Sequence, residues 1–367
     1  MLKRYLAATA AGTITLALAA CGSTDPLASQ NSTPSSQSAA SELDGTLTGA
    51  GASSQESAMD AWRAGFQTEH PNVTVTYDPV GSSGGRTQFT EGGLAFAGTD
   101  APLTPDEVKA ADQRCEGAGV LQAPLYISPI AVIYNVPGVE TLNLSPENLA
   151  GIFNQEITNW NDPSIAADNP DADLPDLAIT PVNRSDGSGT TENFTEYLQA
   201  TAPDAWPHDS SDTWPVTGSQ SAQGTSGVVQ TVQGGEGTIG YADASKAGDL
   251  GIARIEVGGE FVEYSAQAAA AVVDASPREE DRSENDIVFD LDRTTTAAGT
   301  YPLVLVSYAV ACMEYTDANE GQLVTEFLRY TASEEGQEQA ASAAGSAPIS
   351  AELRSDIMTG IDQIVLP

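Results

Sequence analysis

The sequence predicts an α/β fold, because short strand patterns alternate with helical patterns from about Leu47 onward. Two other observations agree with this class. Some strand patterns are apolar throughout, as buried strands are, and several helical patterns are preceded by loops rich in glycine and serine. The chain has 367 residues, enough for two domains, and 40% of them are hydrophobic, which can supply a core for each.

The first 20 residues have the pattern of a secretory signal peptide. A short basic start with Lys3 and Arg4 precedes an apolar run over residues 5–20, which is too short to span a bilayer comfortably. The run ends in residues 18–21 (LAAC), which resemble the bacterial lipobox, so Cys21 is expected to become a lipidated N-terminus. An ordinary signal peptide with an incidental cysteine is the alternative.

Residues 21–45 are expected to form a lipidated cysteine and a flexible tether. They are mostly serine, threonine, glutamine, alanine and proline, which bury too little to offset their own ordering entropy. A lipid and a tether would anchor the folded part to the outer face of the cytoplasmic membrane, where disulfides persist.

Two cysteines, Cys115 and Cys312, remain in the expected folded part. A pair left over in an exported protein favours a disulfide over two free thiols. Neither cysteine lies in a metal-ligand spacing, and the chain has only 2 histidines, so no metal site is expected.

The balance of charge excludes one class of partner. With 51 Asp and Glu against 14 Lys and Arg, the formal net charge is -37. Binding to a nucleic-acid backbone depends on clustered cations, so no nucleic-acid partner is expected. Net charge governs solubility and repulsion, however, and does not determine what one neutralised pocket can bind.

The strand patterns are apolar on one face or on both. In chain order they are residues 73–77 (VTVTY), 94–98 (LAFAG), 130–134 (IAVIY), 177–180 (LAIT) and 303–310 (LVLVSYAV). The acidic segment 278–293 is expected to be a solvated surface loop.

Helical patterns are marked by the spacing of apolar residues and by capping signals. One begins at Ser53, where Glu56 completes a capping box, and another begins at Thr191. Two more cover residues 322–330 and 335–344, the second ended by a glycine.

Three loops at predicted helix starts combine glycines with hydroxyl side chains: residues 49–54 (GAGASS), 80–85 (VGSSGG) and 184–192 (RSDGSGTTE). The third follows a strand, so unpaired N–H groups and the positive end of a helix dipole meet at its tip. Arg184 adds a cation suited to bidentate hydrogen bonds. In a chain with few cations, three such loops indicate a small oxyanion held chiefly by neutral dipoles. For the third loop alone, a simple helix cap with Arg184 and Asp186 paired locally is the alternative.

Asp100 discriminates between oxyanions. It lies in residues 98–103 (GTDAPL), at the end of a short strand, where a carboxylate suits an anion site only if the ligand carries a proton to donate. Phosphate near neutral pH carries one, whereas sulfate does not and would meet like-charge repulsion. Asp100 as the N-cap of a helix is the alternative.

Four motifs follow one another along the chain: residues 47–52 (LTGAGA), 81–85 (GSSGG), 99–103 (TDAPL) and 184–190 (RSDGSGT), with 159–162 (NWND) and 237–241 (GTIGY) beside them. Together they resemble the motifs of the phosphate-binding proteins of ABC phosphate importers, the PstS family. The resemblance runs in order over most of residues 46–367, and four motifs in series are far more specific than any one.

The resemblance implies a type II periplasmic-binding-protein fold, in which two α/β lobes joined by two crossovers enclose the ligand in a cleft. We place the crossovers near Leu125 and Tyr301. Lobe one would then comprise residues 46–125 and 300–367, and lobe two residues 126–299. Both cysteines of the folded part fall in lobe one, where a bridge between them is geometrically possible.

The resemblance also implies the ligand residues. Carried over position by position, they are Ser53, Ser54 through its backbone, Ser82, Asp100, Arg184, Asp186, Ser188, Gly189 and Thr190. Asp100 would accept the phosphate proton, and Asp186 would brace Arg184. Many relatives have Thr-Phe where this chain has Ser53-Ser54, which keeps a hydroxyl and a backbone N–H but loses an aromatic wall.

The function implied is capture of inorganic phosphate outside the membrane and its delivery to an ABC-type permease, by lobes that close around the ligand. Such a protein breaks no bond and needs no cofactor, and we expect it to be a monomer. Two alternatives stay open. One is a binding protein for sulfate or molybdate. The other is a secreted serine hydrolase, because residues 81–85 also satisfy G-x-S-x-G, with His208 as the only histidine that follows.

Overall fold

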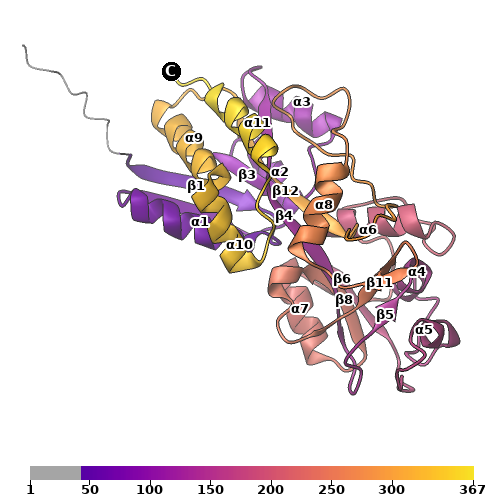
Figure 1. Ribbon diagram of the computed structural model, residues 1–367. Coiled ribbons are helices and arrows are strands. Elements are labelled where there is room, and N and C mark those ends of the chain that lie inside the picture. The colour runs from indigo at the N-terminus through magenta and orange to yellow at the C-terminus, as the bar shows by residue number, and fades with distance from the viewer. Residues whose placement is uncertain (1–42) are drawn as a thin grey trace, which may run out of the picture. The chain divides into compact units, whose positions relative to one another are not determined.

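The structure, a computed structural model, describes residues 43–367. The signal-peptide pattern, Cys21 and the tether up to residue 42 lie outside the described residues. The chain from Glu42 to Pro367 forms one compact unit in which helices cover a long mixed sheet (Figure 1).

The main sheet has nine strands in the order β2-β1-β3-β12-β4-β8-β6-β7, with β9 also paired to β4. A second sheet has three strands, in the order β11-β10-β5. The strands are β1 (Gly45–Gly51), β2 (Val73–Asp78), β3 (Phe96–Thr99), β4 (Val120–Asn135), β5 (Asn143–Leu144), β6 (Thr180–Arg184), β7 (Gln220–Ala222), β8 (Thr238–Asp243), β9 (Gly251–Ile252), β10 (Arg254–Val257), β11 (Glu260–Val262) and β12 (Val304–Cys312).

Helices connect most of the strands. They are α1 (Glu56–Glu69), α2 (Ser82–Thr90), α3 (Pro105–Arg114), α4 (Pro146–Phe153), α5 (Pro163–Asp168), α6 (Gly189–Thr201), α7 (Gly224–Gly234), the short η1 (Ala244–Lys246), α8 (Ala266–Ala275), α9 (Ala318–Ala332), α10 (Glu334–Ala344) and α11 (Ala351–Asp362). In Figure 1, α1, α9 and α10 lie together beside β1, while α4, α5 and α7 lie at the other end of the unit.

Strand β4 joins two halves of the fold. Its residues up to Pro129 pair with β12, and its residues from Ile130 onward pair with β8. We therefore call β1–β3 and β12, with their helices, lobe one, and β5–β11, with theirs, lobe two. Both β4 and β12 are almost entirely buried, as their uninterrupted apolar patterns predict. The exact lobe boundaries remain a proposal.

The strand and helix patterns of the sequence are confirmed with shifted ends, except one. The helix expected from residue 322 begins at Ala318. The strand expected over residues 177–180 is wrong, because β6 begins at Thr180, where that strand was expected to end. The capping box is wrong: α1 begins at Glu56 behind Gln55, which makes no side-chain cap hydrogen bond. Ser53 hydrogen-bonds to lobe two instead, which explains why it does not cap its own helix.

The acidic segment 278–293 is only partly a solvated loop. The Arg278–Asp356 ion pair is exposed, in line with the expectation. Asp286, however, accepts hydrogen bonds from Gln122 of β4 and from Arg282. The hydrogen bond to Gln122 fixes the middle of the segment against the part of β4 that pairs with β12. Periodicity and charge did not indicate this contact.

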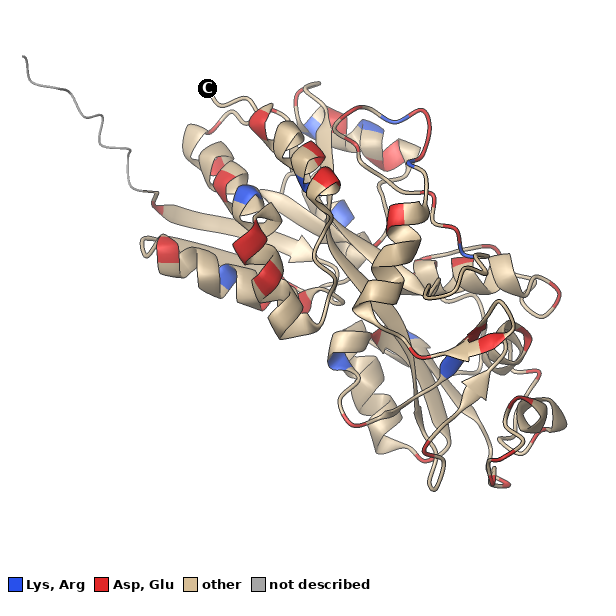
Figure 2. Cartoon of the chain, in the orientation of Figure 1, with Lys and Arg blue, Asp and Glu red and all other residues tan. Residues whose placement is uncertain are grey.

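Acidic residues are spread over helices and loops of both lobes, and basic residues are few and scattered (Figure 2). Cys115, at the end of α3, and Cys312, at the end of β12, form a disulfide with their Cα atoms 5.4 Å apart. The expected bridge is therefore present in the structure, within lobe one.

Candidate anion-binding site

Helices α2, α6 and α7 begin next to one another, and their first residues carry the expected ligand groups. Ser82 is the first residue of α2, and Gly189 is the first residue of α6, which Ser188 caps by accepting a hydrogen bond from Thr191 N at 3.2 Å. A Cβ atom on Gly189 would lie 2.7 Å from Asp100 Cβ and 2.8 Å from Ser82 Oγ. Only glycine allows this approach, which brings the N-terminus of a lobe-two helix against two lobe-one residues.

The Asp100 carboxylate lies at the centre of the site and is 3% exposed. Its Oδ1 accepts hydrogen bonds from Ser54 Oγ at 2.6 Å and from Ser307 Oγ. Its Oδ2 accepts one from Thr190 Oγ1 of lobe two at 2.9 Å. A carboxylate oxygen has two lone pairs. Both lone pairs of Oδ1 accept hydrogen bonds, whereas Oδ2 can accept one more hydrogen bond.

Burial raises the pKa of the Asp100 carboxyl above its ordinary value, and the hydroxyls of Ser307, Ser54 and Thr190 oppose this rise. Asp100 does not cap a helix, because α3 begins at Pro105 behind its own N-cap Thr104. The N-cap alternative is therefore wrong.

Arg184 and Asp186 form an ion pair at the edge of the site. Arg184 Nε donates to Asp186 Oδ1 at 2.8 Å, and a second hydrogen bond joins Nη2 to Oδ2. Burial acts to raise the pKa of Asp186, but the hydrogen bonds and charge of Arg184 outweigh it, so this pKa is lowered. The local pairing and the helix cap considered as an alternative are both present, and the pairing holds the Arg184 side chain, 3% exposed, in a fixed place.

Ser53 links the two lobes on the side of α7. Its Oγ accepts a hydrogen bond from Thr225 N at 3.0 Å and lies 3.0 Å from Thr225 Oγ1. Gly224, the preceding residue, donates its N–H to Asp186 Oδ1 at 3.0 Å. A continuous set of hydrogen bonds therefore runs from Ser53 through α7 to Arg184.

All nine expected ligand residues fall within this hydrogen-bonded cluster or border it directly. Ser54 differs in role, because the resemblance implied its backbone and the structure uses its hydroxyl to orient Asp100.

Several neighbours were missed by the sequence reasoning. Ser307 is the polar residue in an otherwise apolar strand pattern, which was a usable signal. Thr225 opens α7 within residues 222–227 (AQGTSG), a fourth loop of the same composition. Asn193, whose Nδ2 donates to Asp100 O at 2.7 Å and to Gly189 O at 2.8 Å, gave no signal in the sequence.

The geometry offers nothing to the hydrolase alternative. Ser83, the central serine of G-x-S-x-G, donates a hydrogen bond to the Asp212 carboxylate. His208 Nε2 is hydrogen-bonded to Asn154 Oδ1 at 3.0 Å. No hydrogen bond joins Ser83 to His208, so the base that would activate the serine is not in place.

Within residues 43–367, no group of three or more histidine, cysteine, aspartate or glutamate side chains is arranged to hold a metal ion. The same part of the chain has no helix long and apolar enough to cross a membrane.

Comparison with known proteins identifies similar chains. The sequence model of the PBP superfamily domain matches residues 35–335. The chain is 34% identical over 357 residues to the phosphate-binding protein PstS3 of Mycobacterium bovis (strain BCG / Pasteur 1173P2), which covers 95% of each chain. It is 33% identical over 368 residues to PstS2 of the same organism, again over 95% of each chain.

Solved structures share the fold at lower identity. A high-affinity periplasmic phosphate-binding protein with bound phosphate has a TM-score of 0.71 at 22% identity, over 86% of this chain and 93% of that chain. A phosphate-binding protein from Stenotrophomonas maltophilia has a TM-score of 0.67 at 20% identity, over 86% and 93% of the two chains.

Proposed function

Since the chain belongs to the PBP superfamily and, within it, to the PstS phosphate-binding proteins, we propose that it captures inorganic phosphate outside the cytoplasmic membrane and delivers it to an ABC-type permease. Its two α/β lobes, which β4 joins, have the type II periplasmic-binding-protein fold. Phosphate would enter between open lobes, and contacts from both lobes would then favour the closed form, which a permease can distinguish.

The observation that carries the choice of phosphate is the free acceptor position on Asp100 Oδ2. Ser54 and Ser307 occupy Oδ1, and Thr190 takes one of the two positions on Oδ2. The position that remains suits a ligand with a hydroxyl to donate, such as monobasic or dibasic phosphate. Sulfate would place an acceptor against an acceptor.

The other ligand contacts would come from neutral dipoles and one cation. The N-termini of α2 and α6 supply N–H groups, among them those of Gly189 and Thr190. Hydroxyls come from Ser53, Ser82 and Ser188, and Arg184 supplies the charge. Asp186 neutralises much of that charge, so the site would hold its anion by hydrogen bonds within a strongly acidic protein.

Calorimetric titration tests this function. A soluble chain starting at Leu43, which keeps the whole of β1, is unfolded and refolded to remove co-purified ligand. It is then titrated with phosphate and, separately, with sulfate. We expect saturable one-to-one binding of phosphate and far weaker binding of sulfate. Light scattering of the same preparation checks the proposed monomer. Binding of sulfate alone, or of neither anion, would refute the assignment of phosphate.

We further propose that Cys21 carries a lipid that anchors the protein to the outer face of the cytoplasmic membrane. The lipobox-like residues 18–21 support this, and the sequence between Cys21 and β1 is long enough for a tether. The Cys21→Ser variant, expressed from the full chain in a bacterium with a lipoprotein pathway, should move from the membrane fraction to the soluble fraction. Unchanged membrane association would contradict the anchor.

A further inference from the structure

A guanidinium of lobe one meets a carboxylate of lobe two beside the candidate site. Arg86, on α2, is 4% exposed, and its Nη2 lies 3.1 Å from Asp212 Oδ2. Ser83, on the same helix, donates its hydroxyl to the same carboxylate oxygen. Neither Arg86 nor Asp212 is among the residues expected to touch phosphate, so their meeting needs another reason.

Arg86 is held in position by its own lobe. Its Nε donates to Glu107 Oε1 at 2.8 Å, and its Nη1 donates to Thr99 Oγ1 at 3.1 Å. Its Nη2 lies 3.5 Å from Ser83 Oγ of the same helix and also reaches the partner in lobe two. Because the side chain is already ordered, little further conformational entropy is lost when it meets Asp212.

Asp212 is tied in turn to the loop expected to hold the anion. Its carbonyl oxygen accepts a hydrogen bond from Ser188 N at 2.9 Å, and Ser83 N donates to Gly187 O at 3.3 Å. The carboxylate of Asp212 therefore contacts lobe one while its backbone supports residues of the loop 184–192. A movement of the lobes that breaks one set of contacts also disturbs the other.

Arg86 also lies near several carboxylates that surround Glu192, among them Asp212 and Glu107. Burial raises the pKa of Glu192, on α6, to about 7, with Arg86 opposing the rise and Asp212 adding to it. Without Arg86, closing the lobes would bring Glu107 of lobe one toward the acidic groups of lobe two with nothing between them.

We propose that Ser83, Arg86 and Asp212 form a latch that stabilises the closed lobes and so retains phosphate without touching it. This inference rests on the proposed phosphate-binding function and assigns these residues a positioning role within it. Another ion pair between the lobes, Lys246–Glu56, has side chains that are 25% and 31% exposed and is expected to contribute less.

The test compares Asp212→Ala with Asp209→Ala, an exposed acidic residue of the same loop. Both changes remove one negative charge near an anion site, which by itself should tighten phosphate binding slightly. We expect Asp212→Ala to weaken phosphate binding about tenfold, through faster dissociation, because the closed form loses its latch. Asp209→Ala should bind as well as the unmodified chain or slightly better, and Asp212→Asn, which keeps an acceptor oxygen, should recover part of the loss.

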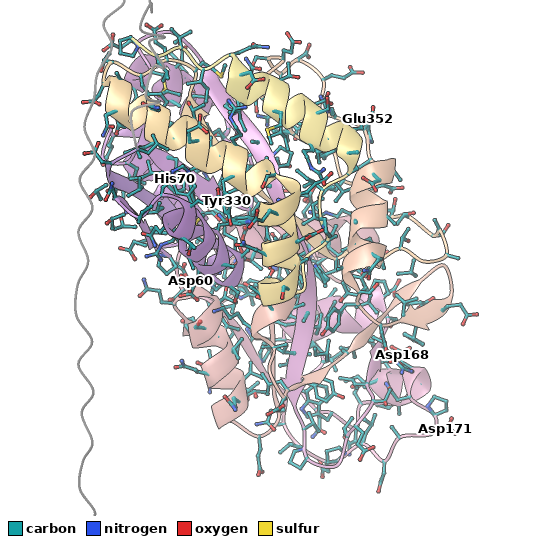
Figure 3. All side chains as sticks on the ribbon, turned by 60° about the vertical axis from the view of Figure 1, so that its left-hand side comes forward. Asp60, His70, Asp168, Asp171, Tyr330 and Glu352 are labelled. Carbon is teal, nitrogen blue, oxygen red and sulfur yellow. A yellow bond between two sulfur atoms is a disulfide. The ribbon has the colours of Figure 1, made fainter. Side chains whose placement is uncertain are left out.

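A second readout reports on the lobes directly. Dyes on Asp60→Cys of lobe one and Asp171→Cys of lobe two, which lie far apart on the surface in Figure 3, report the distance between the lobes. In phosphate-free protein, Asp212→Ala should shift this distance distribution relative to Asp209→Ala. Dissociation constants for phosphate and sulfate, measured on the same variants, should keep the same ratio, because the latch contacts neither anion.

The outcomes separate the two proposals. Equal phosphate affinity in Asp212→Ala and Asp209→Ala, or weaker binding with no change in the distance distribution, would overturn the latch and leave the phosphate function intact. If the unmodified chain does not bind phosphate, the proposed function fails. The latch would then be judged by the distances alone, supported by a shift in Asp212→Ala and overturned by its absence.

Discussion

Asp100→Asn is expected to reduce the preference for phosphate over sulfate by about 100-fold or more, because a buried site that accepts a ligand hydroxyl discriminates strongly against a ligand without one. Ser54 and Ser307 both donate to Oδ1, so the amide oxygen of asparagine should stay at that position. The amide nitrogen then replaces Oδ2 and points a donor at the ligand. That reversal favours a fully deprotonated oxyanion such as sulfate over a ligand that must donate.

The measurement is the pair of dissociation constants for phosphate and sulfate, obtained at one pH and one ionic strength. Asp78→Asn is the matched control, because Asp78 is exposed at the end of β2 and its replacement removes the same charge. A ratio of constants in Asp100→Asn equal to that in Asp78→Asn would show that Asp100 does not select phosphate by accepting its proton.

The alternation of strands and helices could be predicted from the sequence because each element carries its own periodicity. Strands β2 and β12 and helices α6 and α10 all lie where their patterns indicated. The ends of the helices and strands could not be predicted as well where side chains near those ends take part in tertiary contacts. Ser53 and Glu56 have the spacing of a capping box, but a hydrogen bond to Thr225 in the other lobe draws Ser53 away from the helix.

The candidate site could be predicted where its residues lie in loops with a distinctive composition. Most of the expected ligand residues lie in such loops, and in the structure they meet in one hydrogen-bonded cluster. Ser307 and Asn193 were missed because each lies inside a regular element, where a single polar residue has many possible explanations. The Arg86–Asp212 contact was missed for a different reason, because it joins residues that are far apart in the sequence and lie in different lobes.

Breaking the disulfide is expected to lower the free energy of unfolding by about 3–5 kcal/mol, while phosphate affinity stays the same. Cys115 and Cys312 are separated by 197 positions, and the closed loop contains the whole of lobe two. The bridge therefore limits the unfolded chain far more than a short loop would. Both cysteines lie in lobe one, and Cys312 is at the end of β12 beyond Ser307, so the candidate site should keep its geometry.

Urea unfolding of the unmodified protein with and without reductant measures this contribution. A Cys115→Ala/Cys312→Ala double variant is the control, because its unfolding should not respond to reductant. The oxidised protein should also show a smaller dependence of unfolding free energy on urea, since a cross-linked unfolded chain exposes less surface. Two free thiols in freshly purified, denatured and unreduced protein would contradict the bridge itself. Equal free energies of unfolding in water with and without reductant would instead mean that strain in the folded state cancels the loss of chain entropy in the unfolded state.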